Sequence, residues 1–247
     1  MLKFSKGNAK LGKHTLIFNL PAGKTCPAAK FCKSSAVVDV NGKRSIQDGP
    51  DTEFRCFAAS AEVQYNAVYA SRKHNFDLIN EIIIGHVKGY KQHSDLVDLI
   101  DSSLQHHRTK KTSLVRIHES GDFFSQYYLA AWIDVANRNP DLKFYCYSKS
   151  LNLFLDIVLP ENFYMTASYG GRHDALIDQG YFKRYCVVCK TQRDADLLGL
   201  EVDHDDSHCF YSRPFALLVH GTQPKGSEWS KAIQERKKAK EFVGYSK

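Results

Sequence analysis

Three cysteines in the first quarter of the chain have the residue type best suited to inorganic chemistry. Cys26 and Cys32 lie in the irregular run Cys26-Pro-Ala-Ala-Lys-Phe-Cys32, and Cys56 lies where a helix is expected to begin. Thiolates are preferred ligands of zinc and of iron–sulfur clusters, and a helix amino end favours the thiolate form of Cys56. Three protein ligands leave one coordination position open, as a reactive metal centre requires. The residues alone do not distinguish metal ligands from separate buried thiols.

A second polar group is the segment Arg116-Ile-His-Glu-Ser-Gly-Asp122, which follows a predicted strand. Alternation along the strand predicts that Arg116 and His118 share one face and point toward the site. Glu119 or Asp122 could act as a base or orient His118, and a glycine at position 121 permits close approach of the backbone. Alternatively, Ser120 or Asp122 caps a helix, and both roles are compatible.

A third group is Asp203-His-Asp-Asp-Ser-His-Cys209. Its carboxylates, with His204 and His208, could bind a divalent cation or supply a general base beside the cysteines, although acidic loops are often simply solvated. Cys209 is the first substitute for a fourth ligand. Cys186 and Cys189 lie three apart in an apolar strand, where they should face opposite sides, which favours a structural role. Cys146 is predicted to lie in the core.

Composition narrows the class of protein. The 247 residues are 43% hydrophobic and 25% charged, typical of a globular chain. No apolar run approaches the roughly 18 residues of a membrane span, and the first residues lack the pattern of a secretory signal. Seven cysteines, an odd number, argue against a disulfide framework. We therefore expect a cytoplasmic protein without a membrane partner.

The elements that must position these residues alternate between strands and helices. Strands are predicted at 15–19, 113–118, 143–148, 162–168, 184–190 and 215–220, and helices from 57, at 95–104, 125–137, 151–158, 192–198 and 228–242. This alternation predicts an α/β fold that resembles a β/α barrel, either a complete or an incomplete TIM-type barrel, with an open doubly wound sheet as the runner-up. We expect a single domain, 1–247, with an irregular cysteine-bearing segment at 1–57. In either architecture, functional sites lie at the carboxyl ends of the strands.

The predicted last helix is basic. The formal net charge of the chain is +7, and this helix contains several of its cations, which are Lys231, Arg236, Lys237, Lys238 and Lys240. They could contact nucleic acid or could form a solvated face.

Several motifs together resemble the bacteriophage family called "gene product 88". They are Gly7-Asn-Ala-Lys-Leu-Gly-Lys13, Leu20-Pro-Ala-Gly-Lys-Thr-Cys-Pro27, Cys56-Phe-Ala-Ala, His118-Glu-Ser-Gly-Asp-Phe-Phe124, Asp203-His-Asp-Asp-Ser-His208 and His220-Gly-Thr-Gln-Pro224. This resemblance implies a phage-encoded protein of the host cytoplasm.

More loosely, the arrangement is similar to radical S-adenosylmethionine proteins. That resemblance implies that Cys26, Cys32 and Cys56 bind an iron–sulfur cluster, expected to be 4Fe-4S. It also implies that Ser120, Gly121 and Asp122 hold the amino group of S-adenosylmethionine. The chain departs from the compact cysteine motif of those proteins, because 23 residues separate Cys32 from Cys56. The cluster is therefore expected without the radical reaction.

The leading hypothesis is an iron–sulfur protein with a redox or cluster-assisted role on an unidentified small molecule or redox partner. Arg116, His118, Glu119, Asp122, His204 and His208 are the candidate catalytic residues. Alternatives are a nucleic-acid-binding accessory protein with a structural metal and a zinc-dependent hydrolase that uses the 203–208 segment. Whether the protein is an enzyme stays open.

Overall fold

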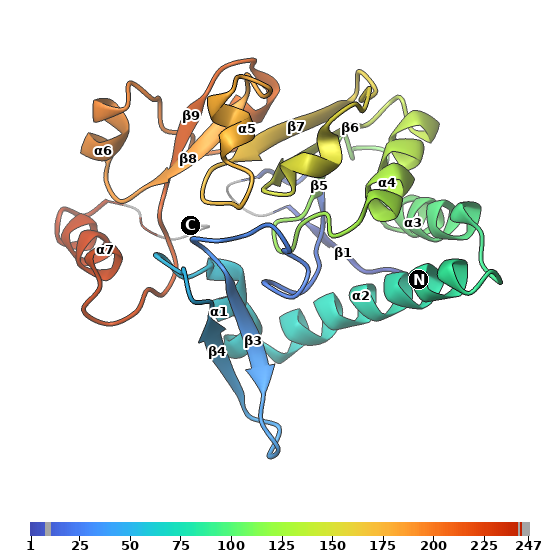
Figure 1. Ribbon diagram of the computed structural model, residues 1–247, viewed down its shortest axis with the longest axis horizontal. Coiled ribbons are helices and arrows are strands. Elements are labelled where there is room, and N and C mark those ends of the chain that lie inside the picture. Colours follow the sequence, from blue (N-terminus) through green and yellow to red (C-terminus); the bar gives the residue numbers. More distant parts are fainter. Residues whose placement is uncertain (8–10, 242, 244–247) are drawn as a thin grey trace.

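A mostly parallel β-sheet organises the molecule (Figure 1). The structure is a computed structural model that describes residues 1–7, 11–241 and 243. Within those residues the order across the sheet is β1-β2-β5-β6-β7-β8-β9; β1 is antiparallel to β2 and every other pair is parallel. The strands are β1 (Phe4–Lys6), β2 (Thr15–Phe18), β5 (Leu114–Ile117), β6 (Lys143–Ser148), β7 (Phe163–Ser168), β8 (Tyr185–Cys189) and β9 (Phe215–Leu218), with β3 (Ser34–Val38) and β4 (Arg44–Asp48) in a separate hairpin.

From β2 onward the strands follow chain order across the sheet. Each connection therefore steps to the next strand in the same direction, and right-handed crossovers place the connecting helices on one face. A doubly wound sheet reverses this direction at a switch point, so the runner-up architecture is wrong. In the described residues the sheet is open, with β1 and β9 as its outermost strands. The α/β class is confirmed, whereas a closed barrel is not seen.

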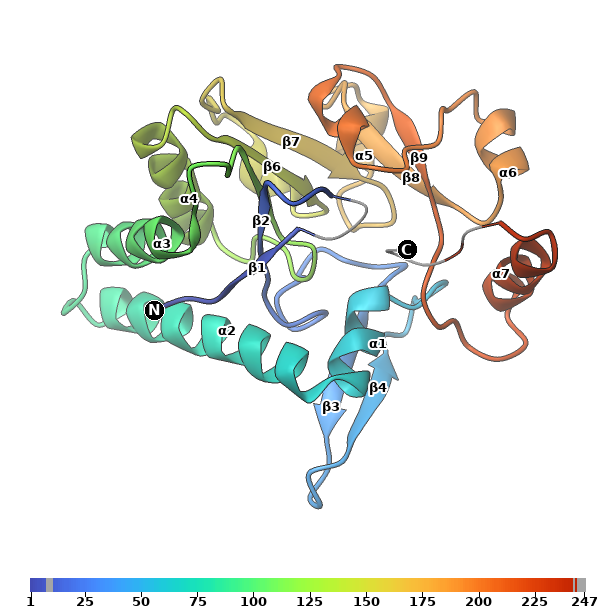
Figure 2. The ribbon, with the colours of Figure 1, turned by 180° about the vertical axis from the view of Figure 1, so that it is seen from behind.

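Helices α2, α3 and α4 lie together on one side of the molecule, and α7 lies at the opposite end, as both ribbon views show (Figures 1 and 2). None of the helices in the part of the chain that is described is long and apolar enough to cross a membrane. The helices are α1 (Phe57–Gln64), α2 (Asn66–Val87), α3 (His93–His107), α4 (Gln126–Arg138), α5 (Ala175–Asp178), α6 (Gln192–Leu197) and α7 (Glu228–Lys238), with 3₁₀ turns at Leu151–Phe154 and Ser207–Phe210.

The main core lies between the sheet and helices α3 and α4. Alternate residues of the parallel strands, such as Val115, Ile117 and Phe144, face this layer. Trp132 of α4 is fully buried there, with its ring 5.2 Å from that of Phe18. Burying a large apolar side chain contributes about 1.5–3 kcal/mol, so this layer fixes the sheet and hence the loops at its edges.

The opposite face of the sheet, which we call the inner face, is polar and aromatic. Arg116, Tyr145 and Tyr164 are the intervening residues of β5, β6 and β7. Phe210 packs on two of them, with ring centroids 5.5 Å from Tyr145 and 5.0 Å from Tyr164. The segment 203–210 therefore covers part of this face.

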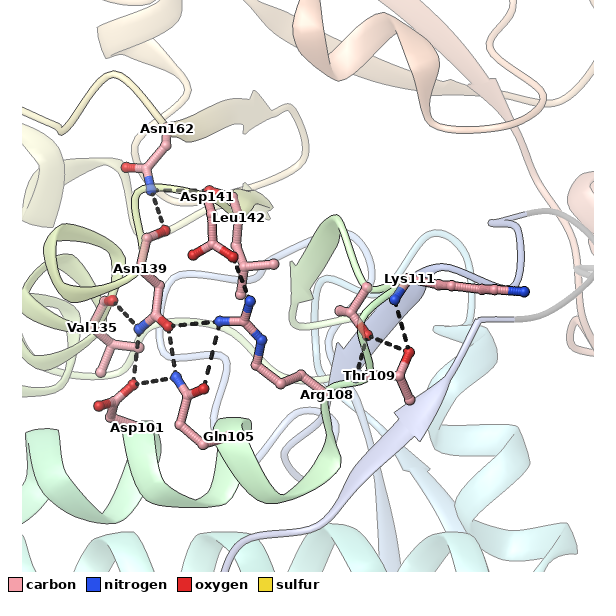
Figure 3. A network of polar contacts seen from close by, with 11 residues as sticks. Asp101, Gln105, Arg108, Thr109, Lys111, Val135, Asn139, Asp141, Leu142 and Asn162 are labelled. Carbon is pink, nitrogen blue, oxygen red and sulfur yellow. Dashed lines mark hydrogen bonds and ion pairs between the residues drawn. The ribbon is translucent and has the colours of Figure 1, made fainter.

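We call the edge where the parallel strands begin the amino edge and the edge where they end the carboxyl edge. At the amino edge, a polar network joins the ends of α3 and α4 to the loops before β6 and β7 (Figure 3). Asn139 donates to Asp101 and to the Val135 carbonyl, each at 2.8 Å, and it accepts from Gln105 at 2.7 Å. The side-chain amide of Asn162 lies 3.0 Å from the Leu142 carbonyl oxygen. These bonds satisfy groups at helix ends that would otherwise lack partners.

The predicted elements from residue 112 onward are present, with most boundaries within two residues. The first 57 residues are less irregular than expected, because they also contain β1 and the β3–β4 hairpin, whose tip holds Gly42 at φ 78°. The expected helix at 151–158 is only a 3₁₀ turn. The last helix ends at Lys238, and position 242 of its expected range lies outside the described residues.

Candidate metal centre

The loop that carries Cys26 begins directly after β2 and lies against the carboxyl edge. The backbone N–H of Leu20 donates to the Ser120 carbonyl at 2.9 Å. Gly121 has φ 90°, and a Cβ atom there would lie 2.7 Å from both Leu20 Cβ and Thr25 Oγ1. The close approach that Gly121 permits is therefore to the cysteine loop itself.

The stretch between Cys26 and Cys32 continues along the same edge to the end of β7. The Phe31 N–H donates to the Gly170 carbonyl at 2.9 Å, and the Arg172 N–H donates to the Ala28 carbonyl at 2.8 Å. An antiparallel bridge joins Ala29 to Gly171. These bonds fix the backbone between the two cysteines.

Cys56 immediately precedes α1, as predicted. The ring of Phe57, the first residue of α1, lies 4.4 Å from the ring of His220, which follows β9. Gly221 has φ 79°, and a Cβ atom there would lie 2.8 Å from Phe57 Cβ. The third cysteine therefore lies over the same carboxyl edge as the other two.

The three thiols are half-buried and influence one another electrostatically. Burial raises the pKa of Cys26 well above its ordinary value, with further contributions from Asp122, Cys56 and then Cys32. Burial, together with Cys32, raises the pKa of Cys56 to about 11, although Arg72 and backbone N–H groups of α1 act in the opposite direction. As free thiols, Cys26 and Cys56 are protonated at neutral pH, and a metal would have to displace these protons.

Among the described residues, no group of three or more His, Cys, Asp or Glu side chains is arranged to hold a metal ion. All seven cysteines are free. The fold thus brings Cys26, Cys32 and Cys56 into one region without gathering them around a single point.

A buried ion pair supports this region, and the sequence reasoning missed it. Glu62 of α1 accepts from the Ala22 N–H at 2.8 Å and from Arg72 of α2 at 2.9 Å, and Arg72 also donates to the Ala58 carbonyl. Ser120 Oγ lies 3.3 Å from the same Glu62 oxygen. Burial raises the pKa of Glu62, against the effect of Arg72. The sequence does indicate this pair. Glu62 lies four residues after Ala58, on the buried face of an otherwise apolar helix, where a carboxylate needs a partner.

Asp122 lies at the carboxyl edge and is held by the protein itself. Its carboxylate accepts from Ser148 Oγ at 2.7 Å, from the Lys149 N–H at 2.8 Å and from its neighbour Phe123. Burial raises its pKa despite these bonds. The ammonium group of Lys149 is buried and donates to Ser168 Oγ at 2.5 Å. Asp122 thus joins the ends of β5 and β6 beside Cys26.

His118 does not share a face with Arg116, contrary to expectation. The strand ends at Ile117, and the left-handed backbone of His118, with φ 70°, turns its ring into the main core. There Nε2 lies 2.8 Å from the Tyr128 hydroxyl, and burial lowers the pKa of His118 to about 3. Glu119, the next residue, is half-buried in the loop.

Arg116 does occupy the inner face. It pairs with Asp206, and its guanidinium lies 5.2 Å from the Tyr147 ring centroid. The Tyr145 hydroxyl lies 3.4 Å from Asp206. Burial is the main cause of the raised pKa of Tyr145.

The 203–208 segment lies on the inner face, where Asp206 pairs with Arg116, and its role beside the cysteines stays a prediction. Lys143, the first residue of β6, lies over the Phe210 ring, and Arg184, which precedes β8, donates to the Tyr211 carbonyl at 2.7 Å. His204 is exposed, whereas His208 is buried with Nδ1 3.3 Å from Asp203.

The remaining cysteines lie elsewhere. Cys209 is buried with Asp206 and Asp203 as its acidic neighbours, so it lies with the 203–208 segment, and its part as a fourth ligand stays a prediction. Cys189 packs with Ala195, and Cys146 is in the main core. Cys186 faces the inner side, where its thiol is near Lys149 and Ser168.

The basic last helix presents fewer free cations than expected. Arg236 is buried, donates to the Val219 carbonyl at 2.8 Å and pairs with Glu241 at 3.0 Å. Lys231, Lys237 and Lys238 are exposed. Nucleic-acid binding through this helix stays a prediction.

Comparisons with known proteins place the chain in a phage family. It is 30% identical over 151 residues to the "Gene 88 protein" of Mycobacterium phage L5, covering 58% of this chain and 51% of the relative. It is 28% identical to the "Gene 88 protein" of Mycobacterium phage D29, covering 58% and 50%. The chain thus spans about half the length of these relatives, and no solved structure matches it. Because the family model described as "Gene product 88" matches residues 2–242, nearly the whole sequence, the chain belongs to the gene product 88 family.

Proposed function

We propose that Cys26, Cys32 and Cys56 bind an iron–sulfur cluster, of the 4Fe-4S type, and that the protein has a redox or cluster-assisted function. One observation carries the proposal. Thiols from two segments far apart in the sequence are brought within electrostatic reach of one another, at the carboxyl edge of a parallel sheet. Parallel α/β folds place their functional sites at this edge.

The number of thiols favours a cluster over a structural zinc ion. A structural zinc site is closed by four protein ligands, whereas three thiolates leave one position open. In a cluster each thiolate binds a different iron atom, so the sulfur atoms stand further apart. The donor set fits a cluster, and a bound cluster would supply one-electron chemistry.

The surrounding residues would offset the charge of bound thiolates. Arg72 and two backbone N–H groups of α1 already favour the anionic form of Cys56. Lys33 donates to the Cys26 carbonyl at 2.6 Å, which holds a second cation close to the loop. Cations and N–H donors near a cluster stabilise its more negative, reduced state.

The proposal does not extend to S-adenosylmethionine. Ser120 and Asp122 are buried and engaged with Leu20, Ser148 and the Lys149 N–H, and Gly121 contacts the cysteine loop. These three residues therefore do not fit the role of holding the amino group of that cofactor. The consecutive winding of the parallel strands supports an incomplete β/α barrel around the site.

Anaerobic purification tests the proposal. We expect a brown protein with charge-transfer absorption in the visible range and bound iron and sulfide, all lost in Cys26→Ser, Cys32→Ser and Cys56→Ser. Cys189→Ala is the matched control, since Cys189 belongs to a separate apolar cluster with Ala195 of α6, and it should keep the colour. A colourless, iron-free protein whose three thiols react freely with thiol reagents would discard the proposal.

A further inference from the structure

A cleft of about 430 Å³ lies next to the cysteine-bearing segment. Five aromatic side chains dominate its lining. Phe31 precedes Cys32 in the chain, and Phe54 precedes Cys56 by two residues. Its lining comprises Phe31, Glu53, Phe54, Tyr169, Gly170, Tyr185, Val187, Val188, Leu198, Leu200 and Trp229.

The aromatic side chains come from distant parts of the chain and pack against one another. The Phe54 and Trp229 rings lie 4.8 Å apart, and the Tyr169 and Tyr185 rings lie 5.4 Å apart in an edge-to-face arrangement. Phe31 is fixed to the other side by its bond to Gly170. The cleft is thus built by tertiary packing of 31–54, the end of β7, β8 and α7.

The charges at the cleft are suited to a cation. Glu53 is exposed and is the one carboxylate among the lining residues that the structure describes, and no lysine or arginine is among them. Aromatic faces attract cations, and two of these rings already have a lysine over them. Lys30 Nζ lies 5.2 Å from the Phe31 centroid, and Lys190 Nζ lies 5.8 Å from the Trp229 centroid.

We propose that this cleft binds an organic cation, an alkyl- or arylammonium group with an apolar body. A small metal cation would have to give up its hydration shell for a lining that offers one carboxylate, which is too costly. An anion would face Glu53 and the negative faces of the rings. An apolar cation buries its body against the aliphatic residues and places its charge among the rings and Glu53.

A charge series tests the proposal on the purified protein by isothermal titration calorimetry. Benzyltrimethylammonium, benzyl alcohol and benzoate share a ring and differ in charge. We expect the cation to bind at least tenfold more tightly than either of the others. Equal affinity for the three compounds, or no binding by the cation, would overturn the proposal.

Two variants locate the binding. Glu53→Gln should weaken binding of the cation several-fold and leave benzyl alcohol unchanged, and Trp229→Leu should weaken both. Glu235→Gln removes an exposed acid elsewhere on α7 and should have no effect. Thermal unfolding of each variant checks that the fold is kept. Cation affinity that is unchanged in both Glu53→Gln and Trp229→Leu would show that the cation binds elsewhere and would overturn the proposal.

Discussion

At the scale of single residues, the ion pair of Glu62 and Arg72 supports the cysteine loop, although the sequence drew attention to the acids and histidines of 116–122 and 203–208. Glu62 and Arg72 are both almost fully buried, and they connect α1, α2 and the loop after β2. Removing one partner of a buried pair leaves the other charge without compensation, which costs about 3–5 kcal/mol. The position of the cysteine loop therefore depends on this pair being intact.

Glu62→Ala should accordingly lower the free energy of unfolding by about 3–5 kcal/mol, as measured by urea denaturation. Glu81→Ala, which removes an exposed acid of α2, is the control and should change it by less than about 0.5 kcal/mol. The double variant Glu62→Leu/Arg72→Met removes both charges and should recover much of the loss. Equal stabilities of Glu62→Ala and Glu81→Ala would contradict this role.

His118 predicts a pH dependence of stability. Its pKa is about 3 in the folded protein and ordinarily about 6.5, because burial disfavours the charged ring. The unfolded chain therefore binds the extra proton between pH 6.5 and about 3, and stability falls as the pH falls through that window, by up to about 1.4 kcal/mol per pH unit. Urea denaturation at pH 7 and pH 5 should show this loss, and His118→Phe should reduce it. An identical pH dependence in the variant would refute the assignment.

At the scale of elements, the strands and helices that are apolar and regularly patterned could be predicted, and those held by tertiary contacts could not. In β6 the alternate residues Phe144 and Cys146 face the core, and in α4 Leu129 and Trp132 lie on one buried face. The β3–β4 hairpin was missed because β4, Arg44–Asp48, is mostly polar and its burial comes from packing on α1.

The candidate site also has features that the sequence predicted and features that it did not. The grouping of Cys26, Cys32 and Cys56 in one region was predicted from residue type together with the resemblance to radical S-adenosylmethionine proteins. The place of His118 was not, because it depends on the backbone beyond the end of β5. A left-handed φ at His118 redirects the chain, and alternation carries no information about residues outside the strand.

The network of Figure 3 allows a prediction for the ends of α3 and α4. Asn139 is 3% exposed and bonds with Asp101, Gln105 and the Val135 carbonyl. Asn139→Ala removes a buried amide and leaves the buried Val135 carbonyl without this donor, which should cost about 1–3 kcal/mol in urea denaturation. Thr109→Ala changes an exposed member of the same picture and should be nearly neutral. A loss of similar size in both variants would contradict the importance of Asn139.

At the scale of the whole molecule, the two edges of the sheet differ in what holds them. At the amino edge, the Asn139 network lies next to the main core, and Phe210 packs on Tyr145 on the opposite face. The carboxyl edge is covered by parts of residues 20–57, where Ala22 packs in a small hydrophobic cluster with Ala58 and Ala59 of α1, and this cluster has few large apolar side chains. Segments with few buried apolar contacts open at low free energy. A bound cluster would stabilise the carboxyl edge, where buried apolar packing contributes least.

Removal of the cluster should therefore loosen one part of the chain selectively. We expect hydrogen exchange to become faster within residues 20–57 in the triple variant Cys26→Ser/Cys32→Ser/Cys56→Ser than in anaerobically purified protein, because binding to the folded state alone stabilises it. Exchange in β6 and β7 should stay the same, since these strands rest on the main core. Faster exchange in all segments alike would mean that the cysteines support the whole fold, and unchanged exchange in 20–57 would mean that nothing bound there contributes to its order.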